Sequence, residues 1–157
     1  MQTITPFLWF DRQAEQAARF YVSVFKGGKI LGITRYPEGG PGPAGSVMTV
    51  RFRVLGQEFT ALNGPRACAF TPAVSFVVEC RTQREVDYYW RRLSAGGKKV
   101  QCGWLEDKFG VSWQVVPTPF LRMLEDKNVD RRQRMFAAMT RMVKLDIKKL
   151  RAAARAK

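Results

Sequence analysis

The chain has 157 residues, enough for a sizeable core, and no apolar run near the ~20 residues that a membrane span requires. It contains no histidine, which excludes Ser-His-Asp and Cys-His nucleophiles and removes the commonest zinc and iron ligand. The formal net charge is +14, and the residues from Lys127 onward carry +9 of it, through eleven Lys or Arg and two Asp. Such a basic segment would attract an acidic surface or a nucleic acid.

The first half of the chain predicts a strand, a helix and three further strands. Ile4–Phe10 is rich in β-branched and aromatic residues, which favours a strand. In Ala14–Phe25 the apolar residues recur at helical spacing, and Asp11 is placed to cap this helix. The three strands that follow are Lys29–Tyr36, Ser46–Leu55 and Glu58–Asn63.

Two connections between these strands are distinctive. Gly56-Gln57 fits a two-residue hairpin turn with glycine first. The loop Pro37–Gly45 is rich in glycine and proline, but it lacks the Gly-Lys-Ser ending of a phosphate-binding loop and leads into a strand. A flexible loop near the mouth of a pocket is therefore favoured over a phosphate cradle.

The second half repeats this order after a linker over Pro65–Pro72. A strand over Ala73–Glu79 precedes a helix that Thr82 and Glu85 open as a capping box. The buried face of this helix is predicted to contain Val86, Tyr89, Trp90 and Leu93. The half is completed by one or two strands in Lys98–Lys108, a tight turn at Asp107–Gly110 and a last strand at Val111–Val116.

The C-terminal segment has no Pro or Gly after Pro119, which suits helices. A short helix is expected at Phe120–Leu124, and a basic, alanine-rich one at Ile147–Ala156. Between them, Asp130–Leu145 has the spacing of a longer helix. The buried face of that helix is predicted to comprise Met135, Met139, Met142, Phe136 and Val143.

Together these patterns predict the α+β class, with two βαβββ modules that form a curved mixed sheet around a cleft and a helical C-terminal extension. The expected domain covers residues 1–118, built from modules 3–64 and 72–118, and the extension covers residues 119–157. The three cysteines have no CxxC spacing, and the N-terminus has no basic segment before an apolar run. Free thiols in a reducing cytoplasm are therefore expected.

Five segments carry a family resemblance: ITPFLWFD, GPAGSVMTVRF, ALNGP, FTPAVSFVVEC and QCGWLEDKFGVSWQVVP. Together they resemble the PhnB-like branch of the vicinal oxygen chelate superfamily, which includes glyoxalase I, bleomycin-resistance proteins and extradiol dioxygenases. Members of this branch often carry the name 3-demethylubiquinone-9 3-methyltransferase. The resemblance covers nearly the whole chain and implies paired βαβββ modules, usually in a homodimer, with ligand pockets lined by the concave sheet.

The metal enzymes of this superfamily place their ligands, mostly His and Glu, on four strands. By the resemblance, the matching positions here are near Pro6, Asn63, Ala73 or Ser75, and Gln114. None is a histidine or a carboxylate, and neutral amide and hydroxyl oxygens bind divalent metals weakly, so no metal and no cofactor are expected. The alternating strand-helix order and glycine-rich turn of a usual S-adenosylmethionine-dependent methyltransferase are not found in the sequence either.

The candidate ligand-binding residues are polar or aromatic side chains on or beside predicted strands: Trp9, Asn63, Ser75, Trp104, Trp113 and Gln114. The polar ones would anchor a ligand or form hydrogen bonds at strand ends, and the tryptophans would stack on a flat ligand or pack in the core. Glu106 and Asp107 are expected to be solvated or capping groups. Cys102 is expected to be a buried structural thiol, because no histidine is available to activate it.

The leading hypothesis is a cytoplasmic homodimer that binds a small, partly aromatic or apolar molecule without a catalytic metal. The first alternative is a glyoxalase-like lyase, or a methyltransferase of the demethylubiquinone type as the family name indicates. The second is an interaction protein that binds nucleic acid or an acidic partner through the basic C-terminal helices. For those helices, packing on the domain or on a dimer partner is favoured, and no membrane partner is expected.

Overall fold

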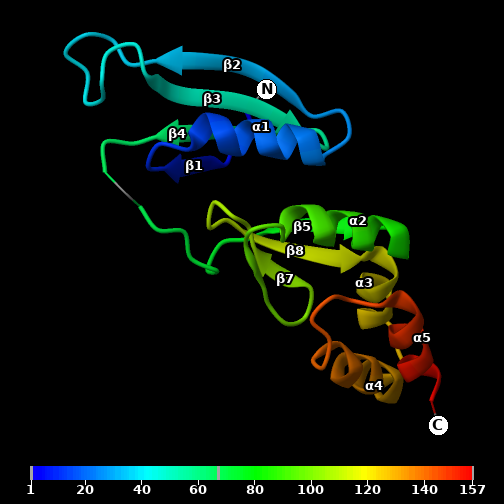
Figure 1. Cartoon of the computed structure of the whole chain (residues 1–157). Helices are drawn as coiled ribbons and strands as arrows, with labels where there is room; N and C mark the ends of the chain where they lie inside the picture. The colour runs from blue at the N-terminus through cyan, green and yellow to red at the C-terminus, as the bar shows by residue number, and fades with distance from the viewer. Residues whose placement is uncertain (1, 67, 157) are drawn as a thin grey trace. The chain divides into compact units, whose positions relative to one another are not determined.

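The computed structural model describes residues 2–66 and 68–156, in two compact units, Met1–Ala69 and Phe70–Lys157 (Figure 1). Residues 1, 67 and 157 lie outside the described residues; they fall in the predicted domain, linker and extension, respectively. Each unit contains one four-stranded mixed sheet with helices, which confirms the α+β class and the repeated module. The division into residues 1–118 and 119–157 stays a prediction.

The first unit has the predicted order of a strand, a helix and three strands. Its elements are β1 (Phe7–Phe10), α1 (Ala14–Val24), β2 (Lys29–Arg35), β3 (Val47–Val54) and β4 (Gln57–Asn63). The sheet order is β1-β4-β3-β2, in which β1 runs parallel to β4 and the other pairs are antiparallel. Helix α1 packs on one face of this sheet (Figure 1).

The core of the first unit lies between α1 and that face of the sheet. The helix buries the stripe that its spacing predicts: Ala14, Ala17, Ala18, Tyr21 and Val24. Tyr21 stacks on Phe52 of β3 with ring centroids 5.8 Å apart, and Phe52 stacks on Phe59 of β4 at 5.3 Å. Small alanines bring the helix close to the sheet, while the aromatic rings supply large buried surfaces.

The prediction that Asp11 caps α1 is wrong. The N-cap residue is Gln13, which makes no side-chain capping bond, and the amide of Ala14 instead donates to Oδ1 of Asn63 (2.8 Å). Asn63 is close enough because it pairs with Phe10 in the parallel strands β1 and β4, which end at the same edge of the sheet. The cap therefore comes from a residue nearly fifty positions away in the chain.

The predicted position of the first hairpin turn is wrong by one residue. Val54 pairs with Gln57, so the two turn residues are Leu55 and Gly56. Both have positive φ, 48° and 84°, as a type I′ turn requires. Glycine accepts this conformation readily, whereas leucine rarely adopts it, and this is why the sequence favours a turn that begins at the glycine.

The second unit repeats the topology of the first. Its elements are β5 (Phe76–Cys80), α2 (Gln83–Leu93), β6 (Lys98–Lys99), β7 (Trp104–Glu106) and β8 (Ser112–Pro117). The sheet order is β5-β8-β7-β6, again with the first strand parallel to the last. The stretch predicted to hold one or two strands holds two short ones, and α2 packs on β5 and β8.

The capping box at the start of α2 is confirmed. The amide of Glu85 donates to Oγ1 of Thr82 (3.2 Å), and Oε2 of Glu85 accepts from the amides of Arg81 (2.6 Å) and Thr82 (3.2 Å). Of the predicted buried face, Tyr89 is half-buried and the other three residues are buried: Val86, Trp90 and Leu93.

Three helices follow the second sheet and share one apolar cluster. They are α3 (Thr118–Leu124), α4 (Val129–Met139) and α5 (Ile147–Arg155). The cluster consists of Val116, Phe120, Met135, Met139, Leu145 and Leu150. Since Val116 belongs to β8, these helices pack on the end of the second sheet.

The predicted long helix from Asp130 to Leu145 is wrong at its C-terminal end, because α4 stops at Met139. The chain then runs beside the loop before β7, whose amides at Cys102 and Gly103 donate to the carbonyls of Met142 and Val143 (2.8 Å each). These bonds hold Met142 and Val143 against that loop in a non-helical segment. Val143 is consequently 46% exposed, and Phe136 is 51% exposed rather than part of the buried face.

Candidate ligand-binding site

Three of the predicted site residues come together on the second sheet. Gln114 of β8 lies opposite Val77 of β5 on one side and Trp104 of β7 on the other. Directly paired residues present their side chains on the same face of a sheet, so the side chains of Val77, Gln114 and Trp104 form a row. Nε2 of Gln114 donates to Oγ of Ser75 (2.9 Å), which adds a hydroxyl to the row. Val77 is half exposed, and Trp104 and Gln114 are half-buried.

Trp113 points to the other face of the same sheet, because successive residues of a strand alternate. Its side chain is only 4% exposed, and its ring centroid lies 5.4 Å from that of Phe76. The indole Nε1 donates to Oδ2 of Asp107 (2.9 Å). Trp113 therefore packs in the core of the second unit, and any role in ligand binding stays a prediction.

Asp107 is a buried turn-capping group. It is 2% exposed, and its Oδ1 accepts from the amides of Phe109 (2.8 Å) and Val111 (3.1 Å). With the bond from Trp113, the carboxylate fixes the turn that leads into β8. Of the two expected roles, a solvated or a capping group, Asp107 has the capping one, and its deep burial was not expected.

In the first unit, Trp9 and Asn63 lie on opposite faces of the sheet. Trp9 pairs with Leu62, the residue before Asn63 in β4. The indole Nε1 of Trp9 donates to the carbonyl of Arg66 (2.9 Å), and the ring covers Gly64 so closely that a Cβ there would lie 1.9 Å from it. Trp9 therefore packs against the backbone that leaves β4, on the face away from α1.

Asn63 uses both ends of its amide to hold the fold. Besides capping α1 through Oδ1, it donates from Nδ2 to the carbonyl of Val47 (3.0 Å), and its own carbonyl accepts from the hydroxyl of Tyr36 (2.5 Å). These groups line a cavity of about 680 Å³ between α1 and the glycine-rich loop. Gly42 of that loop lies on the Tyr36 ring, where an added Cβ would be 2.4 Å from a ring carbon.

Several residues that line this cavity are not predicted as site residues from the sequence. Its further polar lining includes Asp11, Arg12, Glu15, Gln16 and Arg19. Glu15 is already paired with Arg19 (2.6 Å), one turn away on α1. The glycine-rich loop, predicted to lie near a pocket mouth, does line the cavity. Tyr36 could have been predicted as a lining residue of this cavity, because it ends a predicted strand directly before the glycine-rich loop.

A family model and a solved relative show the family to which this chain belongs. A family model described as 3-demethylubiquinone-9 3-methyltransferase matches residues 2–116. A solved Bacillus cereus PhnB protein of that description is 39% identical, with a TM-score of 0.68, over 74% of this chain and 100% of the other. The chain belongs to this family. It is the PhnB-like branch of the vicinal oxygen chelate superfamily.

Two more distant solved structures share the fold of this PhnB-like chain. The protein PA1353 from Pseudomonas aeruginosa is 22% identical, with a TM-score of 0.63, over 74% of this chain and 98% of the other. The fosfomycin resistance protein FosX from Mesorhizobium loti is 12% identical, with a TM-score of 0.53, over 73% and 90%. No curated protein matches the chain in sequence.

The positions of this PhnB-like chain that correspond to metal ligands do not fit a divalent metal. The amide of Asn63 is used at both ends, and that of Gln114 donates to Ser75. Pro6 offers only a backbone carbonyl, which accepts from the amide of Thr60 (3.0 Å). Across residues 2–66 and 68–156, no three His, Cys, Asp or Glu side chains gather where they would hold a metal ion.

The sheets of this PhnB-like chain also differ from the binding fold of a usual S-adenosylmethionine-dependent methyltransferase. That fold needs neighbouring parallel strands joined by helices, with a glycine-rich turn after the first strand. Here each sheet has one parallel pair, and its other strands are antiparallel. The family description therefore supplies no cofactor site that these residues build.

Two of the three thiols, those of Cys80 and Cys102, pack in apolar surroundings, whereas that of Cys68 is exposed. Burial raises the pKa of the Cys80 thiol to about 12, so it is protonated at neutral pH. Cys102 is half-buried and packs against the apolar cluster of the C-terminal helices.

Among the described residues, no helix combines the length and the apolar content that crossing a bilayer requires.

Proposed function

We propose that this PhnB-like protein binds a small, partly aromatic or apolar molecule on the second sheet, without a catalytic metal. The observation that carries the proposal is the row of Val77, Gln114 and Trp104, with Ser75 bonded to Gln114. An indole and an exposed valine supply apolar surface, and the amide-hydroxyl pair supplies a few placed polar groups. This mixture is typical of small-molecule sites.

The bound molecule stacks on the Trp104 indole, and the carbonyl oxygen of the Gln114 amide accepts a hydrogen bond from it. The bond from Gln114 to Ser75 fixes the orientation of that amide. A positioned polar group selects a ligand more strongly than an apolar wall, because a ligand without the matching donor leaves it unpaired.

The proposal includes a cytoplasmic homodimer. Membership of the PhnB-like family supports a dimer, and the three free cysteines support a reducing compartment. Native mass spectrometry of freshly purified, untagged protein tests the ligand, the metal and the assembly in one measurement. We expect a dimer that carries a reproducible non-metal mass. A stoichiometric divalent metal would overturn the proposal and favour the glyoxalase-like lyase.

Tryptophan fluorescence then tests the position of the site. The co-purified molecule should quench the emission of the wild-type chain and of Trp9→Phe, which is the matched control. It should quench the emission of Trp104→Phe much less, and Gln114→Leu should bind it about tenfold more weakly, the usual cost of one lost hydrogen bond. Equal quenching in the two tryptophan variants would place the site elsewhere.

A further inference from the structure

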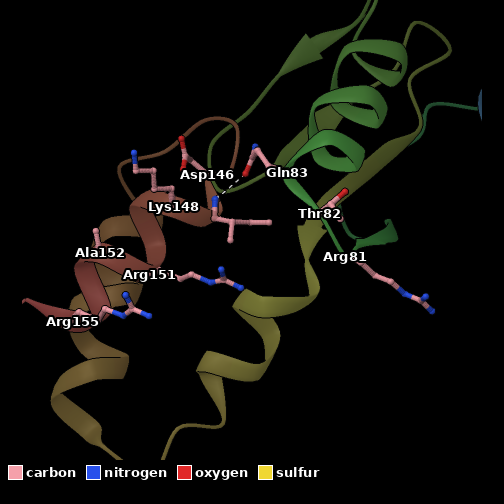
Figure 2. A pocket seen from close by; sticks show the side chains of 9 residues that line it. Arg81, Thr82, Gln83, Asp146, Lys148, Arg151, Ala152 and Arg155 are labelled. Carbon is pink, nitrogen blue, oxygen red and sulfur yellow. Dashed lines mark hydrogen bonds between the residues drawn. The ribbon is translucent and has the colours of Figure 1, made fainter.

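A hollow of about 750 Å³ lies in the second unit, beside α5 and the first turn of α2 (Figure 2). Its lining comprises Arg81, Thr82, Gln83, Asp146, Ile147, Lys148, Arg151, Ala152 and Arg155. The family match ends at residue 116, so the whole α5 side of this hollow lies beyond the part of the chain that the family defines. It is also separate from the proposed small-molecule site on the second sheet.

The hollow carries uncompensated positive charge. Lys148, Arg151 and Arg155 follow one another at spacings of three and four residues, which places them along one side of α5. Arg81 adds a fourth cation from the start of α2. In the part of the chain that the structure describes, none of these four side chains takes part in an ion pair.

The single carboxylate in the lining does not neutralise these cations. Asp146 is the N-cap of α5, and its Oδ1 accepts from the amide of Lys149 (2.9 Å). Figure 2 shows Arg151 and Arg155 extending to the same side of α5, with Lys148 and Arg81 at opposite ends of the lining set. One negative charge turned toward its own helix thus faces four cations.

Three backbone amides at the start of α2 are already bonded within the capping box. Those of Arg81 and Thr82 donate to the carboxylate of Glu85, and that of Glu85 donates to the hydroxyl of Thr82. A ligand in the hollow therefore meets side chains, chiefly guanidinium groups. The planar fork of a guanidinium matches the oxygens of a phosphate with two parallel hydrogen bonds.

The two walls of the hollow are fixed to each other before any ligand binds. The side chain of Gln83 donates to the carbonyl of Leu145 (3.1 Å) and accepts from the amide of Ile147 (2.9 Å). Lys144 adds an ion pair to Asp87 of α2 (2.5 Å). The dashed line that ends at Gln83 in Figure 2 marks the second of these Gln83 bonds. Preorganised walls lower the conformational entropy that the protein loses when a ligand binds.

We propose that this hollow binds the phosphate group of a small organic phosphate. The concave shape and the volume suit a small ligand rather than a convex duplex. The lining contains no aromatic side chain on which a base would stack, so single-stranded nucleic acid is not favoured. Arg151 and Arg155 supply guanidinium donors for the phosphate oxygens, and Arg81 and Lys148 add positive charge at the two ends of the lining.

The test is isothermal titration of the full-length chain with inorganic pyrophosphate in about 50 mM salt, where phosphate contacts are strong. The double variant Arg151→Gln/Arg155→Gln should bind pyrophosphate about tenfold or more weakly. The control Arg141→Gln/Lys149→Gln removes two cations outside the lining and should stay within about twofold of wild type. Arg151→Lys/Arg155→Lys keeps the charge without the fork and should fall between them.

A short DNA duplex in the same buffer distinguishes the source of the phosphate. Because counterion release depends on how many phosphates are neutralised, both double glutamine variants should lose the same part of any duplex binding. The proposal is overturned if both variants lose pyrophosphate binding equally, or if wild type does not bind it. It is also overturned if the Arg151/Arg155 pair loses duplex binding alone. The substituted side chains are all exposed, and circular dichroism confirms that each variant folds.

Discussion

Single side chains hold together elements that are distant in this chain, and Asn63 is the clearest case. It joins the start of α1, the start of β3 and the ring of Tyr36. Neither its position nor its type predicts this role, because a cap from another strand depends on which strands are neighbours. The prediction favoured Asp11 because a capping pattern in the sequence includes only residues next to the helix in the chain.

We therefore expect Asn63→Ala to lower the free energy of unfolding by about 1–3 kcal/mol, through the lost cap and the unpaired carbonyl of Val47. Asp11→Ala should change it by less than about 0.5 kcal/mol, as exposed surface substitutions usually do. Urea denaturation at neutral pH measures both. An equal loss in the two variants would mean that Asp11 caps the helix in solution.

Cys80 gives a second test at this scale. Its pKa of about 12 lies above that of an unfolded thiol, because burial disfavours the thiolate. Below the pKa of the unfolded thiol, Cys80 is protonated in both states, and the full stability of the folded protein is present. As pH rises from there toward 12, the unfolded thiol ionises while the folded one stays protonated, so the folded protein loses stability. At pH 8, iodoacetamide should label the exposed Cys68 readily and Cys80 only after unfolding, as peptide mass spectrometry would show. Labelling at similar rates would contradict the buried environment.

At the scale of elements, the sequence predicts the strands and helices well, because their apolar residues recur clearly at the spacing of a strand or of a helix. The capping box of α2 and the buried stripe of α1 are both local patterns, and the structure confirms them. The end of α4 could not be predicted, since it depends on bonds to the loop at Cys102 and Gly103. The site was predictable only in part. Strand alternation separates Gln114 from Trp113, but which of the two faces is buried in the core depends on how the elements pack.

The hairpin at Leu55-Gly56 offers a stabilising substitution. Asn-Gly is the preferred pair for a type I′ turn, and asparagine tolerates positive φ better than leucine. Leu55 is exposed, so little packing is lost. We expect Leu55→Asn to raise the free energy of unfolding by about 0.5–1 kcal/mol in urea denaturation. Gly56→Ala should have the opposite effect, and a loss in both would contradict the turn type.

Gln83 is the element-scale test of the C-terminal packing. Gln83→Ala removes two bonds between α2 and the chain at Leu145–Ile147, and we expect a loss of about 1–3 kcal/mol in stability. Pyrophosphate binding should weaken as well, because the walls of the hollow lose a connection. Gln133→Ala, in the exposed part of α4, is the matched control and should leave both quantities unchanged. If Gln83→Ala binds pyrophosphate as wild type does, Gln83 does not position that site.

At the scale of the whole molecule, the C-terminal helices form part of the second unit. Leu145 packs against Gly103, where an added Cβ would lie 3.1 Å from its side chain. Leu145→Ala should therefore cost about 2–5 kcal/mol. Hydrogen exchange should show reduced protection of amides in β8 and α5 and unchanged protection in β3. Reduced protection in α5 alone would show that the helices are a separate appendage.

The two units share one strand pairing. In each sheet, the strand that comes first in the chain is paired in parallel with the strand that comes last. Because a helix and two strands separate the paired strands in the chain, we expect this pairing to be the slowest contact of each unit to form. During synthesis, β4 completes the first sheet while β8 has yet to be made, and domains generally fold in the order in which they emerge. We therefore expect each unit to have its own folding step, and the basic helices to pack last, once the end of the second sheet has formed.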